Sequence, residues 1–160
     1  MTQQLSSDLV WNEIKKELFA VLGMVTAKGE ARTAGIVYIV HNQKLYISTR
    51  TREWKTRHIQ SNPNVSITVP IAKCVPFLPW IKIPQATITF AGQAKVYEPK
   101  NVEGEIMHAL LRGQETDPEN LTGLSVLEIE PRGEFVTYGI GIPLMQMRFP
   151  EKARGRAPIV

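Results

Sequence analysis

Two hydroxyl residues and a lysine lie where a predicted strand meets a predicted helix. Ser48 and Thr49 end the strand-like run 44–49, and Lys55 falls in the first turn of the helical segment 53–60, which we expect Thr51 to cap. Short hydroxyl donors, a helix N-terminus and a cation are groups that bind phosphate in proteins. This junction therefore predicts a phosphate site. A solvated turn with a surface lysine has the same spacing, so both interpretations stay open.

Three arginines are expected near the same junction. Arg50 and Arg52 lie in the turn itself, and Arg32 begins the neighbouring strand. In an antiparallel meander, the Arg32 end of that strand lies beside the Thr49 end of the next one. Together with Lys55, the pattern predicts four cations around one pocket. The alternative is that these side chains occupy separate exposed faces.

The composition is that of a single globular domain spanning residues 1–160. Hydrophobic residues make up 43% of the chain and charged residues 21%, which is ordinary for such a domain. The chain has 19 Lys and Arg against 15 Asp and Glu, a net charge of +4. An anionic small molecule explains this modest excess with fewer assumptions than a nucleic acid, so we expect a small-molecule substrate and no nucleic-acid partner.

We do not expect a disulfide-stabilised, metal-binding or membrane-spanning protein. Cys74 is the single cysteine, and His41, His58 and His108 lack metal-ligand spacing. The N-terminal residues lack the basic and apolar regions of a signal peptide, and no stretch approaches the roughly 18 apolar residues of a membrane span. We therefore expect a cytoplasmic protein with no metal and no membrane partner.

Strand-like runs dominate the chain and predict a mainly β fold. Short turns at Lys28-Gly29-Glu30 and His41-Asn42-Gln43 join the first three runs into an antiparallel meander. Gly92, near the middle of the fifth run, suggests a β-bulge or a sharp bend. The six runs are 21–26, 32–40, 44–49, 65–70, 86–97 and 124–138. Such strands favour a closed or split antiparallel barrel with peripheral helices.

The remaining segments are two helices, an apolar segment and a tail. Asp8 is expected to cap a helix that runs to about Ala20, and a second helix is expected over 99–111. Residues 71–84 are apolar but rich in proline, so they suit neither a helix nor a central strand. We expect this segment to cover a partner subunit or an open cofactor face; the alternative is a flap that packs within its own subunit. The tail, 139–160, is predicted to be irregular and to pack on the barrel or on a partner; it carries Arg148, Lys152, Arg154 and Arg156.

The stretch 29–69 resembles the pyridoxamine 5'-phosphate oxidase-like, FMN-binding split-barrel proteins. The matching pieces are GEARTAGIVYIV, KLYIST and the lysine of TREWKTRHIQSNPNVSITV, and FAGQAKVYE in the fifth run also fits. The resemblance covers most of residues 10–140. It implies a six-stranded antiparallel split β-barrel that forms a homodimer, with FMN bound in the clefts between the two subunits.

The resemblance also implies which residues contact the cofactor. Ser48, Thr49 and Lys55 look like phosphate ligands, and a strand edge lines the flavin. Trp80 and the tail arginines would come from the other subunit. The full predicted set is Arg32, Thr33, Ala34, Gly35, Ile36, Ser48, Thr49, Arg50, Thr51, Trp54, Lys55 and Thr87.

Departures from the family pattern bear on the substrate. Trp54 stands where the oxidases proper have an arginine, and Ala34 and Gly35 stand where they have basic residues. We therefore expect an FMN-dependent oxidoreductase acting on a substrate other than the vitamin. One alternative is a non-enzymatic binder of a flavin, deazaflavin or haem. Another is an anion- or nucleic-acid-binding barrel that uses the basic tail.

Overall fold

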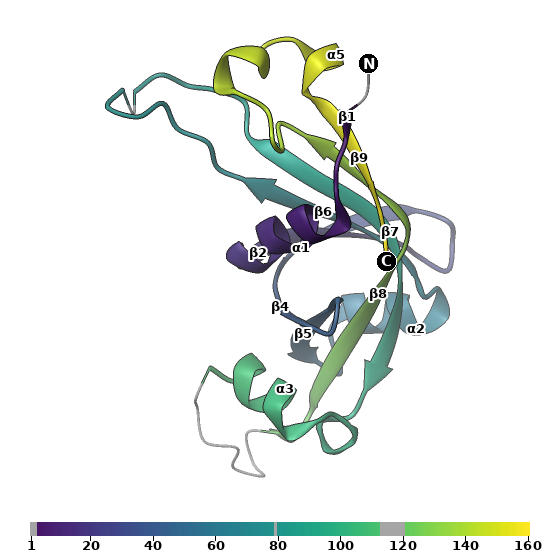
Figure 1. Ribbon diagram of the computed structural model, residues 1–160. Coiled ribbons are helices and arrows are strands. Elements are labelled where there is room, and N and C mark those ends of the chain that lie inside the picture. The colour runs from purple at the N-terminus through teal and green to yellow at the C-terminus, as the bar shows by residue number, and fades with distance from the viewer. Residues whose placement is uncertain (1–2, 79, 113–120) are drawn as a thin grey trace.

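The computed structural model describes residues 3–78, 80–112 and 121–160, and its strands form one nine-stranded sheet (Figure 1). The order is β1-β9-β8-β7-β6-β2-β3, with β5 paired to both β4 and β8. The strands are β1 (Gln3–Gln4), β2 (Phe19–Val25), β3 (Ala31–Val37), β4 (Ile39–His41), β5 (Lys44–Arg50), β6 (Asn64–Ile71), β7 (Ala86–Tyr97), β8 (Leu124–Tyr138) and β9 (Arg154–Pro158). The helices are α1 (Ser7–Lys16), α2 (Trp54–Ser61), α3 (Gly104–Leu110), α5 (Pro150–Ala153), and the 3-10 turns η1 (Pro99–Asn101) and η2 (Leu144–Gln146).

The predicted mainly β fold with peripheral helices is confirmed, and each of the six predicted runs contains a strand. The second run is divided at Tyr38, because β3 pairs with β2 whereas β4 pairs with β5. The sheet is therefore open: among the described residues β3 has no ladder to β5, and β5 joins the rest of the sheet through β8. Strands β1 and β9 extend the sheet beyond the six predicted strands.

Two short turns confirm the predicted meander. Asn42 and Gln43 both have positive φ, 46° and 57°, as a two-residue hairpin turn between His41 and Lys44 requires. Gly29 also has positive φ and its N–H donates to the Thr26 carbonyl oxygen. These turns set the register of β2 with β3 and of β4 with β5.

The bulge does not lie at Gly92 as predicted. Gly92 pairs regularly with Pro131, and the register between β7 and β8 shifts between Thr89 and Ala91. A Cβ at position 92 would lie 3.0 Å from the Glu130 carbonyl oxygen. The glycine therefore permits close strand contact rather than an extra residue.

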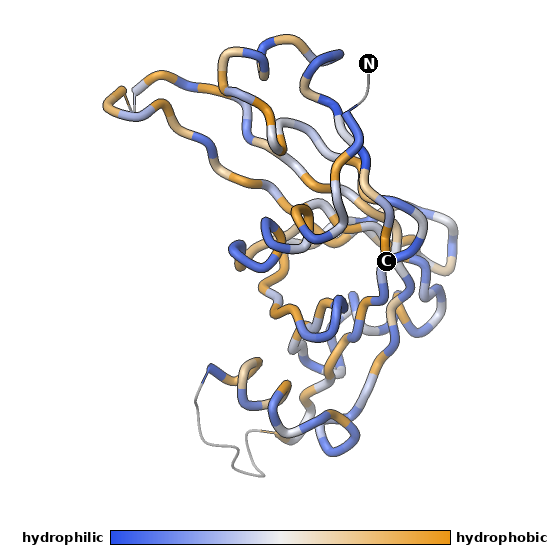
Figure 2. Tube along the Cα trace, viewed as in Figure 1, coloured by the Kyte–Doolittle hydropathy of each residue, from blue (hydrophilic) through white to orange (hydrophobic). Residues whose placement is uncertain are grey.

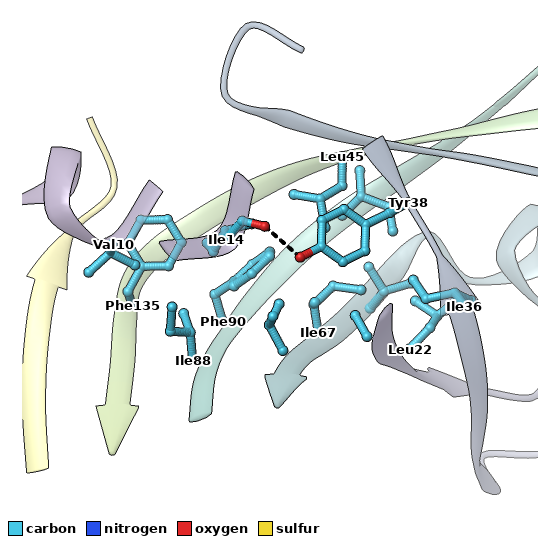
Figure 3. Packing of buried hydrophobic residues seen from close by; sticks show 14 of the residues in the cluster. Val10, Ile14, Leu22, Ile36, Tyr38, Leu45, Ile67, Ile88, Phe90 and Phe135 are labelled. Atoms are coloured by element: carbon cyan, nitrogen blue, oxygen red, sulfur yellow. Dashed lines mark hydrogen bonds between the residues drawn. The ribbon is translucent and has the colours of Figure 1, made fainter. Parts of the chain in front are cut away.

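Helix α1 covers the apolar face of the sheet, but its predicted limits were wrong. Ser6, not Asp8, caps it by accepting a hydrogen bond from the Leu9 N–H, and the helix ends at Lys16 because β2 has begun by Phe19. The helix buries Val10, Trp11 and Ile14. Figure 3 shows Val10 and Ile14 in the core with side chains from the sheet, among them Ile67, Ile88, Phe90 and Phe135.

Residues 72–78 and 80–85, between β6 and β7, form an arm that projects from the body of the molecule (Figure 1). The described part of the arm contains neither helix nor strand, as its prolines predicted. It carries many apolar residues (Figure 2), and the side chains of Phe77 and Trp80 are 96% and 72% exposed. Packing within the single chain therefore leaves this arm uncovered.

The tail is not irregular as predicted. It contains η2, α5 and β9, and β9 pairs antiparallel with β8 and parallel with β1. The alternating burial of Gly155 and Ala157 against exposed Arg154 and Arg156 is typical of a strand with one covered face. Among the described residues, none of the helices is long and apolar enough to span a membrane.

Candidate functional site

A cavity of about 520 Å³ lies where β3, β4, β5, α2 and α3 meet. Four residues of the predicted site line it: Gly35, Ile36, Ser48 and Lys55. The whole lining is Leu18, Gly35, Ile36, Val37, Tyr38, Ile39, Ile47, Ser48, Lys55, Ala109, Leu110 and Arg112. The structure thus places Ser48 and Lys55, two of the residues predicted to bind phosphate, beside the edge of β3 that is predicted to line a flavin.

Local structure explains how Ser48 and Lys55 meet. Ser48 lies near the end of β5, and the chain turns through residues 51–53 into α2, where Lys55 is the second residue. The turn is held by the Glu53 N–H, which donates to the Arg50 carbonyl oxygen, and by the Thr56 hydroxyl, which donates to the same oxygen. A strand end and a helix start are therefore fixed beside one cavity.

The predicted cap of α2 was wrong. Glu53 is the N-cap residue, and its side chain makes no capping hydrogen bond. Thr51 instead shares a 2.8 Å hydrogen bond with the Ser125 hydroxyl on β8. This places Thr51 on the wall of a different, larger cavity of about 730 Å³.

An ion pair lies beside the cavity, whose lining also includes the cation Arg112. The Lys55 ammonium contacts the Glu53 carboxylate, with the two side chains 17% and 39% exposed. This lysine lowers the pKa of Glu53 below its ordinary value, so the carboxylate is ionised at neutral pH. Lys55 therefore faces the cavity with its charge already partly compensated.

Thr49 provides a buried hydroxyl close to this ion pair. Its side chain is 5% exposed, and its Oγ1 makes no hydrogen bond of normal geometry within the described structure. It lies near enough to the Glu53 carboxylate to make a minor contribution to the lowered pKa of that group, after the larger one from Lys55. Thr49 is not among the residues that line the cavity.

Several predicted site residues lie elsewhere. Arg32 and Thr33 line a shallow hollow with Asn64 and Ser66, and the Arg32 guanidinium pairs with Glu30 at 3.0 Å. The reason is that β3 pairs with β2 and diverges from β5 beyond Tyr38, so the Arg32 end does not reach Ser48.

The other predicted contacts also lie outside the lining of this cavity. Arg50 and Arg52 are exposed, so the four predicted cations do not gather around one pocket. Trp54 is 40% exposed and its ring meets that of His58 edge-on. Ala34 packs against the core, and Thr87 sits in β7 between Pro70 and Tyr138.

Helix α3 supplies lining residues that the sequence did not indicate. Ala109 and Leu110 at its end, and Arg112 just beyond it, close one side of the cavity. Leu18 and Ile39 add further apolar surface. These residues are distant in sequence from 48–55, and no spacing rule connects them. Across the described residues, no group of three or more His, Cys, Asp or Glu side chains is placed to hold a metal ion.

Solved structures with this fold have diverse descriptions. General stress protein 26 of Bacillus anthracis has a TM-score of 0.60 and 19% identity, over 85% of this chain and 94% of that one. An F420 reductase has a TM-score of 0.54 and 17% identity, over 78% and 93%. The haem storage protein HutZ of Vibrio cholerae has a TM-score of 0.64 and 14% identity, over 85% and 97%. At these identities the likeness shows the fold alone.

The sequence comparison is more specific. No curated protein matches the chain. The pyridoxamine 5'-phosphate oxidase family matches residues 9–137, a span that includes the cavity and the strands around it. The chain therefore belongs to the pyridoxamine 5'-phosphate oxidase family.

Proposed function

We propose that the protein binds FMN in the cavity between β3, β5 and α2, and that it is an oxidoreductase with a small-molecule substrate. The observation that supports this most is the shared lining of Ser48, Lys55, Gly35 and Ile36. A hydroxyl and an ammonium at one end suit a phosphate, and the glycine-containing strand edge suits a flat ring. Bound FMN would supply hydride or electron transfer, while the protein binds and orients it.

The phosphate would lie at the Ser48 and Lys55 end. Lys55 provides the cation, Ser48 a short hydroxyl donor, and the N-terminus of α2 a partial positive charge of about half a unit. The Thr49 hydroxyl is buried close to Glu53 behind this lining. These groups fit an anionic phosphate better than a neutral ligand.

The ring would lie along β3. Gly35 and Ile36 of β3 line the cavity, and the missing side chain at Gly35 makes room for the Phe19 ring, because a Cβ there would lie 2.9 Å from its Cε2. Leu18, Ile39 and Leu110 provide apolar walls around this edge. An apolar cavity with a few polar groups at one end is the usual form of a cofactor site.

Deazaflavin and haem binding are the alternatives, because neighbours of this fold are described as an F420 reductase and a haem storage protein. Haem iron is held by His, Cys, Met or Tyr side chains. Of the residues that line the cavity, Tyr38 alone belongs to these types, and its hydroxyl donates to the Ile14 carbonyl oxygen. This favours a flavin or deazaflavin over haem.

A homodimer is part of the proposal. The exposed apolar residues Phe77 and Trp80 on the arm, and Leu18 and Val37 beside the cavity, are 51–96% exposed in the single chain. Apolar surface of this kind favours burial against a second copy. The cytoplasmic location stays a prediction.

The visible spectrum of the purified protein tests the cofactor, together with mass spectrometry of what heat releases. A flavin spectrum and the mass of FMN are expected. A deazaflavin or haem would replace the proposed cofactor, and turnover with a reduced nicotinamide would separate an enzyme from a carrier. A colourless protein that binds no added FMN would contradict the proposal.

A further inference from the structure

We propose that the Glu53 carboxylate pairs with Lys55 when the site is empty and releases Lys55 when a phosphate binds. Glu53 therefore competes with the phosphate, and it sets how strongly the site prefers phosphorylated ligands. The inference rests on the proposed function. It concerns a residue that does not line the cavity but contacts the cation that does.

The contact depends on where the helix begins. Side chains two residues apart do not face each other on an α-helix. Glu53 is the N-cap residue and is extended, with φ −67° and ψ 147°, so its side chain can reach Lys55 in the first turn. The carboxylate makes no hydrogen bond to the N–H groups of α2, which an N-cap side chain ordinarily does. Its main partner is Lys55, and the Arg50 backbone and the Thr49 hydroxyl make smaller contributions to its lowered pKa.

The electrostatic consequence follows from the charges. Lys55 and Glu53 together carry no net charge beside Ser48. A phosphate that approaches Lys55 meets a carboxylate already bonded to it, so binding requires the ion pair to open. A neutral ligand that occupies the apolar part of the cavity requires no such exchange. Glu53 therefore weakens binding of phosphate and leaves the neutral ring largely unaffected.

Exposure favours this exchange. The Glu53 side chain is 39% exposed and the Lys55 side chain 17%. A displaced carboxylate can therefore be hydrated, whereas the lysine stays beside the cavity. Strictly buried pairs resist separation because an unpaired buried charge is costly. In this pair, the partly exposed Glu53 carboxylate can move away from Lys55 into water.

The test compares FMN with riboflavin, which lacks the phosphate, in direct binding titrations of the apoprotein. Glu53→Gln removes the competing charge and keeps the side-chain shape. We expect it to bind FMN about 10-fold more tightly, the scale of one charge–charge interaction at a partly exposed site, and riboflavin within about 2-fold of wild type. Weaker FMN binding would mean that Glu53 positions Lys55 for the phosphate, and an equal change for both flavins would mean an effect on cavity shape. Either result overturns the inference.

The chain offers a matched control. Glu98 and Lys100 form another pair at the same spacing, 2.6 Å apart, and both line the larger cavity. Glu98→Gln removes an equivalent charge away from the proposed site and is expected to leave both affinities unchanged. Tighter FMN binding in this variant would overturn the assignment to Glu53, because net charge alone would explain the effect.

Inorganic phosphate separates this inference from the proposed function. Thermal unfolding is measured in phosphate and in chloride of equal ionic strength. We expect phosphate to raise the Tm of Glu53→Gln more than that of wild type. If neither flavin binds but this difference remains, the FMN proposal fails and the role of Glu53 stands. If flavins bind but neither flavin selectivity nor the phosphate response depends on Glu53, the inference fails and the proposed function stands. If no flavin binds and phosphate raises the Tm of Glu53→Gln no more than that of wild type, both are overturned.

Discussion

The Tyr38 hydroxyl donates a 2.7 Å hydrogen bond to the main-chain carbonyl oxygen of Ile14, the contact drawn in Figure 3. It connects α1 to the point where β3 ends and β4 begins. Tyr38 also lines the proposed cofactor cavity, and its N–H donates to the Leu18 carbonyl oxygen. The bend that shapes the cavity is therefore held by the helix that covers the core.

Tyr38→Phe tests this connection. Tyr38 is 2% exposed, so the substitution leaves the buried Ile14 carbonyl without this donor while the ring still fills its place. We expect a loss of about 1–2 kcal/mol in the free energy of unfolding, measured by urea denaturation at neutral pH. A loss near zero would show that the hydrogen bond does not hold the bend.

The same residue predicts a response to alkali. Burial raises the pKa of Tyr38 above its ordinary value of 10.0, so the folded protein holds this proton more tightly than the unfolded chain. Its contribution is fully present below pH 10 and is lost as the pH rises through the raised pKa. Burial also raises the pKa of Tyr46, which donates to Glu128. We expect the free energy of unfolding to fall as the pH rises above 10, and to fall by about 1 kcal/mol per pH unit less steeply in Tyr38→Phe than in wild type. Urea denaturation at several pH values measures this dependence, and the same pH dependence in both proteins would refute the prediction.

Gly139→Ala is expected to be strongly destabilising. Gly139 has φ +73°, and an added Cβ would lie 2.5 Å from Cε of Met147 and 3.2 Å from Cβ of Ala86. Backbone strain and overpacking together are expected to cost about 2–4 kcal/mol. Gly133→Ala is the matched control, because Gly133 has φ +82° but open space around its Cβ position. Its cost should be about 1 kcal/mol; equal losses in chemical denaturation would show that packing around Met147 contributes nothing.

The arm predicts dimerisation. Phe77 and Trp80 expose large apolar side chains to solvent in the single chain, and such surface favours burial against a partner. We expect light scattering to give the mass of a dimer, and Phe77→Ser with Trp80→Ser to shift it toward monomer. Val160→Ser, which changes another exposed apolar residue, should leave the dimer intact. A wild-type monomer that still binds the cofactor would contradict a role for the arm in assembly.

Local sequence signals predicted the strands and the junction between β5 and α2. The β-branched runs and the two tight turns depend on neighbouring residues, so they could be read without tertiary structure. The apolar character of the arm was likewise visible from its prolines and aromatic residues. Ser48 and Lys55 meet at one cavity because strand, turn and helix follow one another directly.

Long-range pairing could not be read in the same way. A continuous β-branched run across Tyr38 gave no sign that β3 and β4 have different partners, which is why Arg32 was expected beside Thr49. The strand β9 depends on β1 and β8 at distant positions. Arg112 lines the cavity because of how α3 packs. Thr51 does not cap α2 and instead forms a tertiary hydrogen bond with Ser125, and Glu53 is the N-cap residue.

The affinity of Lys55→Ala for FMN tests the central claim most directly. Loss of one charge-assisted hydrogen bond to phosphate, about 1.5–3 kcal/mol, should raise the dissociation constant about 10- to 100-fold in titrations of the apoprotein. Lys100→Ala removes the lysine of the other Glu–Lys pair, on the larger cavity, and should leave the affinity as in wild type. An unchanged affinity in Lys55→Ala, or a greater loss in Lys100→Ala, would contradict FMN binding in the cavity between β3, β5 and α2.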